Sequence, residues 1–81
     1  MSPEGKAVKD FILREFLPGE DPDELKEDTP LFGSGILDSL ATLRLSVFLE
    51  DEFGIRMEAH ELSEDNLGTI TDIANLVASK R

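Results

Sequence analysis

A serine near the middle of the chain stands where a helix is expected to begin. Gly33 and Gly35 permit tight turns, Asp38 is a favoured helix N-cap, and Ser39 falls in the first helical turn. A hydroxyl there is usually exposed, and a phosphate attached to it would lie near free backbone N–H groups and the positive end of the helix dipole. Ser39 is therefore suited to carrying a phosphodiester, although simple capping would also explain this short pattern.

Two other chemistries fit the sequence less well. A serine hydrolase would need a base, but Ser39 lacks a Gly-x-Ser-x-Gly turn and His60 is the only histidine. An EF-hand calcium loop starting at Asp21 would need Gly at its sixth position and Glu at its twelfth, where Lys26 and Phe32 stand. We therefore expect no catalytic residue and no metal ligand in this chain.

Helices are expected to position this serine. Capping residues and apolar spacing predict a first helix from Pro3 that Pro18-Gly19 stops, and helices over 39–53 and 70–81, with a single helical turn around Leu67. Residues 20–35 show no clear period, so we expect a long loop whose spaced apolar residues pin it to the core. The sequence thus predicts an all-α fold: a small four-helix bundle with a short third helix and a long loop between helices one and two.

The expected helix 39–53 is apolar on more than one side. Leu40, Leu43 and Val47 line one face at helical spacing. That stripe is widened by Leu45, Phe48 and Leu49. The pattern predicts a central helix that contacts several neighbours.

The composition excludes several classes of function. Eighteen acidic residues against eight basic ones give a formal net charge of -10, which disfavours binding to nucleic acid or to anionic membranes and favours basic protein partners. There is no Cys, so no disulfide or thiolate metal site is available. No apolar run resembles a signal peptide or reaches the ~20 residues that span a bilayer. We therefore expect a cytoplasmic protein without membrane insertion.

Several motifs occur in a fixed order along the chain. They are Leu31-Phe32, Gly35-Ile36-Leu37-Asp38-Ser39-Leu40, the runs 48–55 and 66–70, Ile73-Ala74 and Val77. In this combination the chain resembles the acyl and peptidyl carrier protein family over nearly its whole length. The resemblance is specific because the Asp-Ser-Leu motif is followed in register by an acidic helix end and a Phe-Gly-Ile sequence.

The resemblance implies a function for Ser39. Residues 1–81 would form a single acyl-carrier domain, and a phosphopantetheinyl transferase would attach 4'-phosphopantetheine covalently to Ser39. Acyl or aminoacyl cargo would then be held as a thioester on the thiol of this arm, and the carrier itself would perform no reaction. The lack of Cys fits this interpretation, because the reactive thiol belongs to the cofactor.

The helix after the serine departs from carriers of fatty acid synthesis, where the corresponding helix is acidic almost from its start. Here Ala41 and Arg44 occupy those positions, and acids appear only at 50–52. The chain therefore looks more like carriers of specialised pathways, including aminoacyl and D-alanyl carriers. The main alternative is an acidic helical protein-interaction module without a prosthetic group.

The cofactor must enter each partner's active site, so partners should contact the surface around Ser39. The expected partners are the transferase, an acyl- or aminoacyl-loading enzyme and downstream synthases, acting on a monomeric carrier. The expected contact residues are Ile36, Asp38, Leu40, Ala41 and Arg44.

Overall fold

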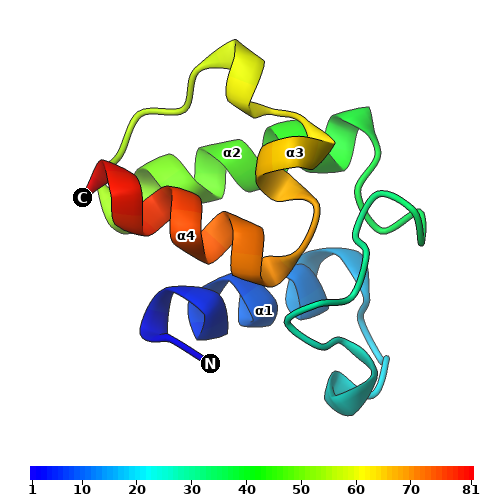
Figure 1. Cartoon of the computed structure of the whole chain (residues 1–81). Coiled ribbons are helices and arrows are strands. Elements are labelled where there is room, and N and C mark those ends of the chain that lie inside the picture. Colours follow the sequence, from blue (N-terminus) through cyan, green and yellow to red (C-terminus); the bar gives the residue numbers. More distant parts are fainter.

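The computed structural model describes residues 1–81 as helices joined by loops, without strands (Figure 1). The helices are α1 (Pro3–Phe16), α2 (Ser39–Phe53), α3 (Glu64–Leu67) and α4 (Ile70–Lys80). Single 3-10 turns lie at Pro22–Glu24 (η1) and Ala59–Glu61 (η2). The predicted all-α fold, with its short third helix and long loop between α1 and α2, is confirmed, whereas the two 3-10 turns were not predicted.

The helix ends follow the residues that favour them. Ser2 caps α1, its Oγ accepting the N–H of Gly5 at 3.1 Å. Gly54 ends α2 in the left-handed region at φ 66°, where a residue without a side chain is favoured. Thr69 caps α4 by accepting the N–H of Asp72 at 3.1 Å. These local bonds satisfy backbone groups that a helix end would otherwise leave unpaired.

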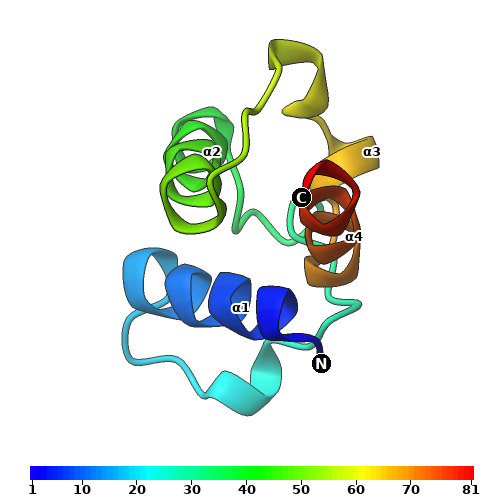
Figure 2. The ribbon, with the colours of Figure 1, turned by 90° about the vertical axis from the view of Figure 1, so that its left-hand side faces the viewer.

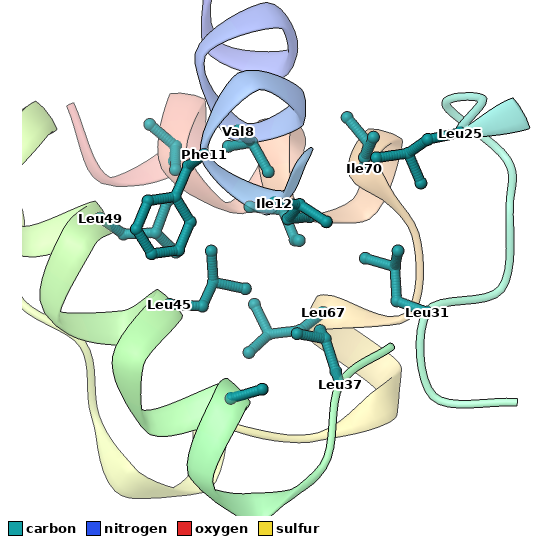
Figure 3. Close-up of a cluster of buried hydrophobic side chains, with 13 residues drawn as sticks. Val8, Phe11, Ile12, Leu25, Leu31, Leu37, Leu45, Leu49, Leu67 and Ile70 are labelled. Atoms are coloured by element: carbon teal, nitrogen blue, oxygen red, sulfur yellow. The ribbon is translucent and has the colours of Figure 1, made fainter. Parts of the chain in front are cut away.

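The core lies where α1, α2 and α4 meet (Figures 2 and 3). Among the helix pairs, α4 packs most extensively on α1. The buried apolar residues come from every α-helix and from the long loop: Val8, Phe11, Ile12, Leu25, Leu31, Leu37, Ala41, Leu45, Leu49, Leu67, Ile70, Ile73 and Val77. A single shared core of this kind is the expected source of stability in a chain without disulfides.

The buried face of α2 is not the stripe that its spacing suggested first. Ala41, Leu45 and Leu49 enter the core, whereas Leu40, Leu43 and Val47 are 67%, 55% and 52% exposed. Both stripes repeat at helical spacing, so the period alone cannot choose between neighbouring faces. Packing against the other elements decides, and it leaves one apolar stripe uncovered.

The loop between α1 and α2 is anchored to the core, as predicted. It buries three leucines, Leu25, Leu31 and Leu37. The Leu31 N–H donates to the Gly68 carbonyl at 2.8 Å, and Thr71 donates to the Glu27 carbonyl through both its N–H and its hydroxyl, each at 3.1 Å. Because these bonds reach the start of α4, the loop holds the beginning of α2 in a defined place.

The connector from Gly54 to α3 is tied to both of its neighbouring helices. The Glu50 carboxylate accepts the Met57 N–H at 2.9 Å. Lys80 of α4 forms an ion pair with Glu61 at 2.8 Å and donates to the Arg56 carbonyl at 2.9 Å. The connector therefore packs back along α2 and α4.

None of the helices is long and apolar enough to cross a membrane.

Candidate functional site

Ser39 is the first residue of α2, and its side chain is exposed. The preceding residue, Asp38, has extended backbone and caps the helix, its Oδ1 accepting the Ala41 N–H at 2.8 Å. Just upstream, Gly35 adopts φ 83°, a conformation that favours glycine, and the chain turns there before entering the helix. The turn and the cap together present the Ser39 hydroxyl at the helix start.

The electrostatics of this helix start suit an anion. The first turn of α2 contains no acidic residue, so the positive end of its dipole is offset only by the capping carboxylate of Asp38. Free backbone N–H groups at a helix start favour phosphate oxygens. The start of α2 therefore suits the phosphodiester that the sequence analysis predicted on Ser39.

An open hollow of about 500 Å³ lies beside Ser39. Its walls come from the loop before α2, from the first turns of α2 and from the residue after η2, and they are formed by Phe32, Leu37, Asp38, Ser39, Thr42, Leu43 and Leu62. The segment that carries Leu62 lies between η2 and α3 (Figure 1). Four of the lining residues are hydrophobic, so the hollow can shelter a flexible chain that starts at Ser39.

Thr42 is the buried polar residue of this hollow, and its hydroxyl has no hydrogen-bond partner. One turn further along α2, Ser46 is equally buried at 6% exposure, but its hydroxyl donates to the Leu43 carbonyl at 2.7 Å. Ser79 of α4 makes the same type of bond to Leu76. Sequence reasoning did not single out Thr42, because a threonine within a helix has no distinctive pattern.

The expected partner-contact residues are not equally accessible. Leu40 is 67% exposed, Asp38 and Arg44 are exposed, and Ile36 is half-buried. Ala41 is only 8% exposed and belongs to the core, so it offers little surface for the partner contact that the sequence predicted. Its position places it on the stripe of α2 that faces the other helices.

Two residues missed as surface candidates are Leu43 and Val47. Both are more than half exposed and continue the line that begins at Leu40. Their spacing along the sequence was noted, but it did not show which face of the helix meets solvent. A contiguous set of exposed large apolar side chains is typical of an interaction surface.

Arg44 is occupied by contacts within the chain. Its guanidinium pairs with the Glu15 carboxylate at 2.6 Å and lies over the Phe16 ring, 5.5 Å from the ring centroid. Both partners belong to α1, so Arg44 joins the end of α1 to the early part of α2. It is half-exposed, and it helps to hold the helix start that carries Ser39.

The competing chemistries gain no support from the structure. His60 is exposed in η2 and forms no hydrogen bond with Ser39. The acidic stretch around η1 lies on the surface, and no group of three or more His, Asp or Glu side chains is placed to share a metal ion.

Comparison with known proteins is consistent with this geometry. The family model described as the phosphopantetheine attachment site matches residues 12–77. The lincomycin biosynthesis protein LmbN of Streptomyces lincolnensis is 42% identical over 67 residues, which cover 83% of this chain but only 24% of that protein. The D-alanyl carrier protein of Streptococcus pyogenes serotype M1 is 43% identical over 54 residues, which cover 67% of each chain.

A solved structure agrees in fold. A chain in the crystal structure of an FAD-dependent dehydrogenase superposes with a TM-score of 0.78 and 30% identity, over 86% of this chain and 97% of that chain. The matched chain is therefore about as short as this one. Together with the family match over most of the sequence, these likenesses show that the chain belongs to the acyl and peptidyl carrier protein family, whose cargo is held on a covalently attached 4'-phosphopantetheine.

Proposed function

We propose that Ser39 is the attachment site of the phosphopantetheine arm. The observation that carries this proposal is an exposed serine at the first position of α2, without a hydrogen bond of its own and at the rim of the hollow. Four of the other serines are engaged: Ser2 caps α1, Ser34 and Ser79 donate to backbone carbonyls, and Ser46 is buried. Ser63 makes no side-chain hydrogen bond either, but it is half-buried and precedes the single turn of α3.

The residues around Ser39 fit the group. The start of α2 offers backbone N–H groups to the phosphodiester, and the apolar walls of the hollow can cover part of the arm. When bound, the cofactor supplies the thiol that holds the cargo. The chain's own residues hold the attachment point and orient the arm, and we assign them no catalytic step.

The cargo is proposed to be acyl or aminoacyl, in a specialised biosynthetic pathway. Two relatives support this assignment: one is a D-alanyl carrier protein and the other a lincomycin biosynthesis protein. The first turn of α2 has no acidic residue, unlike the corresponding helix expected in carriers of fatty acid synthesis. By analogy with the matched structure, an FAD-dependent dehydrogenase is one class of enzyme that could act on this cargo.

Partner enzymes are proposed to dock on the exposed apolar stripe of Leu40, Leu43 and Val47, with Ile36, Asp38 and Arg44 at its edges. The stripe runs along α2 away from Ser39, so a partner seated on it has the attachment point within its interface. Apolar contact area would supply affinity, and the net charge of -10 would steer basic partners toward the surface. A single carrier domain over residues 1–81, a monomeric state and a cytoplasmic location remain predictions.

Mass spectrometry tests the attachment site. The protein is incubated with coenzyme A and a promiscuous phosphopantetheinyl transferase, and the intact mass is measured. We expect the wild-type chain to gain one phosphopantetheinyl group and Ser39→Ala to gain none, with an unchanged helical circular dichroism spectrum because the lost hydroxyl packs against nothing.

The matched control is Ser34→Ala, which removes another exposed serine five positions upstream. This variant should be modified as fully as the wild type. Modification that survives in Ser39→Ala would overturn the assignment of the site. A wild-type chain that folds but gains no mass would instead favour an interaction module without a prosthetic group.

A further inference from the structure

An open groove lies between α1 and α2, which run beside each other (Figure 2). Its volume is about 440 Å³, and none of the residues that line it also lines the hollow beside Ser39. We infer that this groove is a docking site for a basic amphipathic helix of a partner protein, with α1 as well as α2 in the contact. Such a contact needs neither the arm nor its cargo, so it goes beyond the function proposed for Ser39.

The floor of the groove is aromatic and apolar. Phe11 of α1 and Phe48 of α2 stack with their ring centroids 4.2 Å apart, and both line the groove. Val47 lines it as well and is 52% exposed. Aromatic side chains are enriched at the centre of protein interfaces, and exposed large apolar side chains beside them are typical of contact sites. The floor therefore suits apolar anchor side chains from another protein.

The end of the groove nearest the C-terminus of α2 carries two acids without a partner. Asp51 and Glu52 are exposed, and neither forms an ion pair or a side-chain hydrogen bond. Acidic side chains in the last turn of a helix oppose its dipole and weaken the helix. Glu50 compensates for this by accepting the Met57 N–H, but Asp51 and Glu52 make no compensating bond. Cations from a partner would offset their charge.

The opposite end of the groove is electrically balanced. Arg44 and Glu15 both line it and pair with each other at 2.6 Å. Arg44 is the one cation of the lining, so the unbalanced negative charge of the groove lies at Asp51 and Glu52. A partner of complementary charge must place lysine or arginine side chains at that end and can leave the other end neutral.

The length of the groove indicates a helix as the docking element. Arg44 and Glu52 are eight residues apart on α2, which corresponds to about 12 Å along the helix axis. Two turns of another helix cover that distance, so apolar side chains at i and i+4 can both reach the floor. Lysine or arginine side chains in the adjoining turn would then face Asp51 and Glu52.

Synthetic peptides of about 15 residues, long enough to form a helix, test the groove. The first has leucines at helical spacing and lysines elsewhere, the second has glutamates in place of the lysines, and the third has serines in place of the leucines. Binding to the apo protein is measured by fluorescence anisotropy at about 0.15 M salt, and amide chemical shifts locate the peptide. We expect the lysine–leucine peptide to bind most tightly and to shift the amides of Phe11, Arg44 and Phe48.

The contribution of the floor is measured with two exposed apolar residues of α2. Val47→Ala should weaken binding of the lysine–leucine peptide roughly fivefold, because it removes two methyl groups from the groove. Leu43→Ala is the matched control, because Leu43 is equally exposed but lines the hollow beside Ser39. This control should bind the peptide as the wild type does.

The contribution of the acids is measured with two neighbouring pairs. Asp51→Asn combined with Glu52→Gln should weaken binding about 5- to 30-fold, the effect of losing two exposed ion pairs. Glu27→Gln combined with Asp28→Asn removes the same charge from an exposed pair in the long loop that lines neither the groove nor the hollow. This second double variant should stay within about twofold of the wild type.

Ser39→Ala should bind the peptide as the wild type does, so a failure of the proposed attachment site does not affect this result. Equal losses for the two double variants would mean attraction by net charge alone. Shifts centred on Leu43 and Leu62 would place the peptide in the hollow. Weaker binding after loading of the arm would assign the groove to the arm, and self-association that Val47→Ala abolishes would assign it to a second copy of the chain. Each of these outcomes, or no binding of the lysine–leucine peptide, would overturn the inference.

Discussion

The second half of α2 is held on several sides by the rest of the protein, whereas the first half leaves much of its apolar surface uncovered. In the second half, the Phe48 ring stacks on Phe11 at 4.2 Å between centroids, and Leu49 is fully buried. Glu50 accepts the backbone N–H of Met57 from the connector. This end of the helix is therefore fixed by α1 and by the segment that follows it.

The first half of the same helix leaves one apolar face uncovered. Ala41 and Leu45 enter the core, but Leu40 and Leu43 on the neighbouring face are more than half exposed. The buried hydroxyl of Thr42 has no partner. A single helix thus serves as an anchor at one end and as an accessible surface at the other. This arrangement suits a carrier, whose attachment point must be held firmly and yet be approached by several enzymes in turn.

The largest expected difference between the two faces of α2 is in stability. Leu49→Ala should lower the free energy of unfolding by about 2–5 kcal/mol, because it removes a fully buried side chain and leaves a cavity. Leu43→Ala should change it by no more than about 0.5 kcal/mol, because its side chain is 55% exposed. Urea denaturation followed by circular dichroism measures both values.

The reactions of the loaded carrier with its partner enzymes should depend more on Leu43 than on Leu49, the reverse of their order in stability. Leu43→Ala should weaken the reactions of the loaded carrier with its partner enzymes, since it removes part of the proposed docking stripe. A Leu43→Ala protein that is destabilised as strongly as Leu49→Ala would show that the stripe is packed in solution. The contrast between the two faces would then be wrong.

The sequence predicted the helices more reliably than their orientation. Capping residues such as Ser2, Asp38 and Gly54 act locally, so the helix limits could be predicted from short stretches. The buried face of α2 could not, because its two apolar stripes have the same period and only packing against α1 and the long loop distinguishes them. For that reason the predicted partner contact of Ala41 falls on the buried stripe.

The site shows the same division. Ser39 could be identified from its motif, because the motif specifies a local turn and cap. The hollow beside it could not, because its walls come from residues far apart in the sequence: Phe32 from the preceding loop and Leu62 from the far end of the connector.

A smaller effect is expected where the firmly held half of α2 ends. Gly54→Ala should cost roughly 1 kcal/mol, because alanine is strained at φ 66° even though the space around its Cβ is open. The matched control is Gly33→Ala, whose added Cβ would make an ordinary contact of 3.6 Å with Pro30 at an unstrained φ. Thermal melts of both variants provide the comparison. Equal losses for the two would mean that backbone strain at Gly54 is not the cause.

The smallest expected effect on stability concerns the connector between α2 and α3. It leaves the end of α2 at Gly54 and returns toward the start of α2, where Leu62 lines the hollow. It is held to α4 by Glu61, whose carboxylate pairs with Lys80 at 2.8 Å and accepts the Glu58 N–H at 2.8 Å. The Lys80 hydrogen bond is the main cause, and the Glu58 N–H a second one, that lower the pKa of Glu61 below its ordinary value of 4.5. Burial raises the pKa of Glu61, but by less than the hydrogen bonds lower it.

The sign of the pH dependence follows from this direction. A carboxyl whose pKa is lower in the folded than in the unfolded state stabilises the fold at any pH above the unfolded value, and this contribution is lost as pH falls through the folded value. Glu61→Gln should therefore be less stable than the wild type at neutral pH, and the gap should close progressively once the pH drops below 4.5. Glu20→Gln, an exposed substitution outside any ion pair, should show no such convergence. The test is to measure the thermal midpoints of the wild type and both variants across the acid range. If the wild type and Glu61→Gln have equal midpoints at neutral pH, or if their difference widens on acidification, Glu61 does not hold the connector to α4.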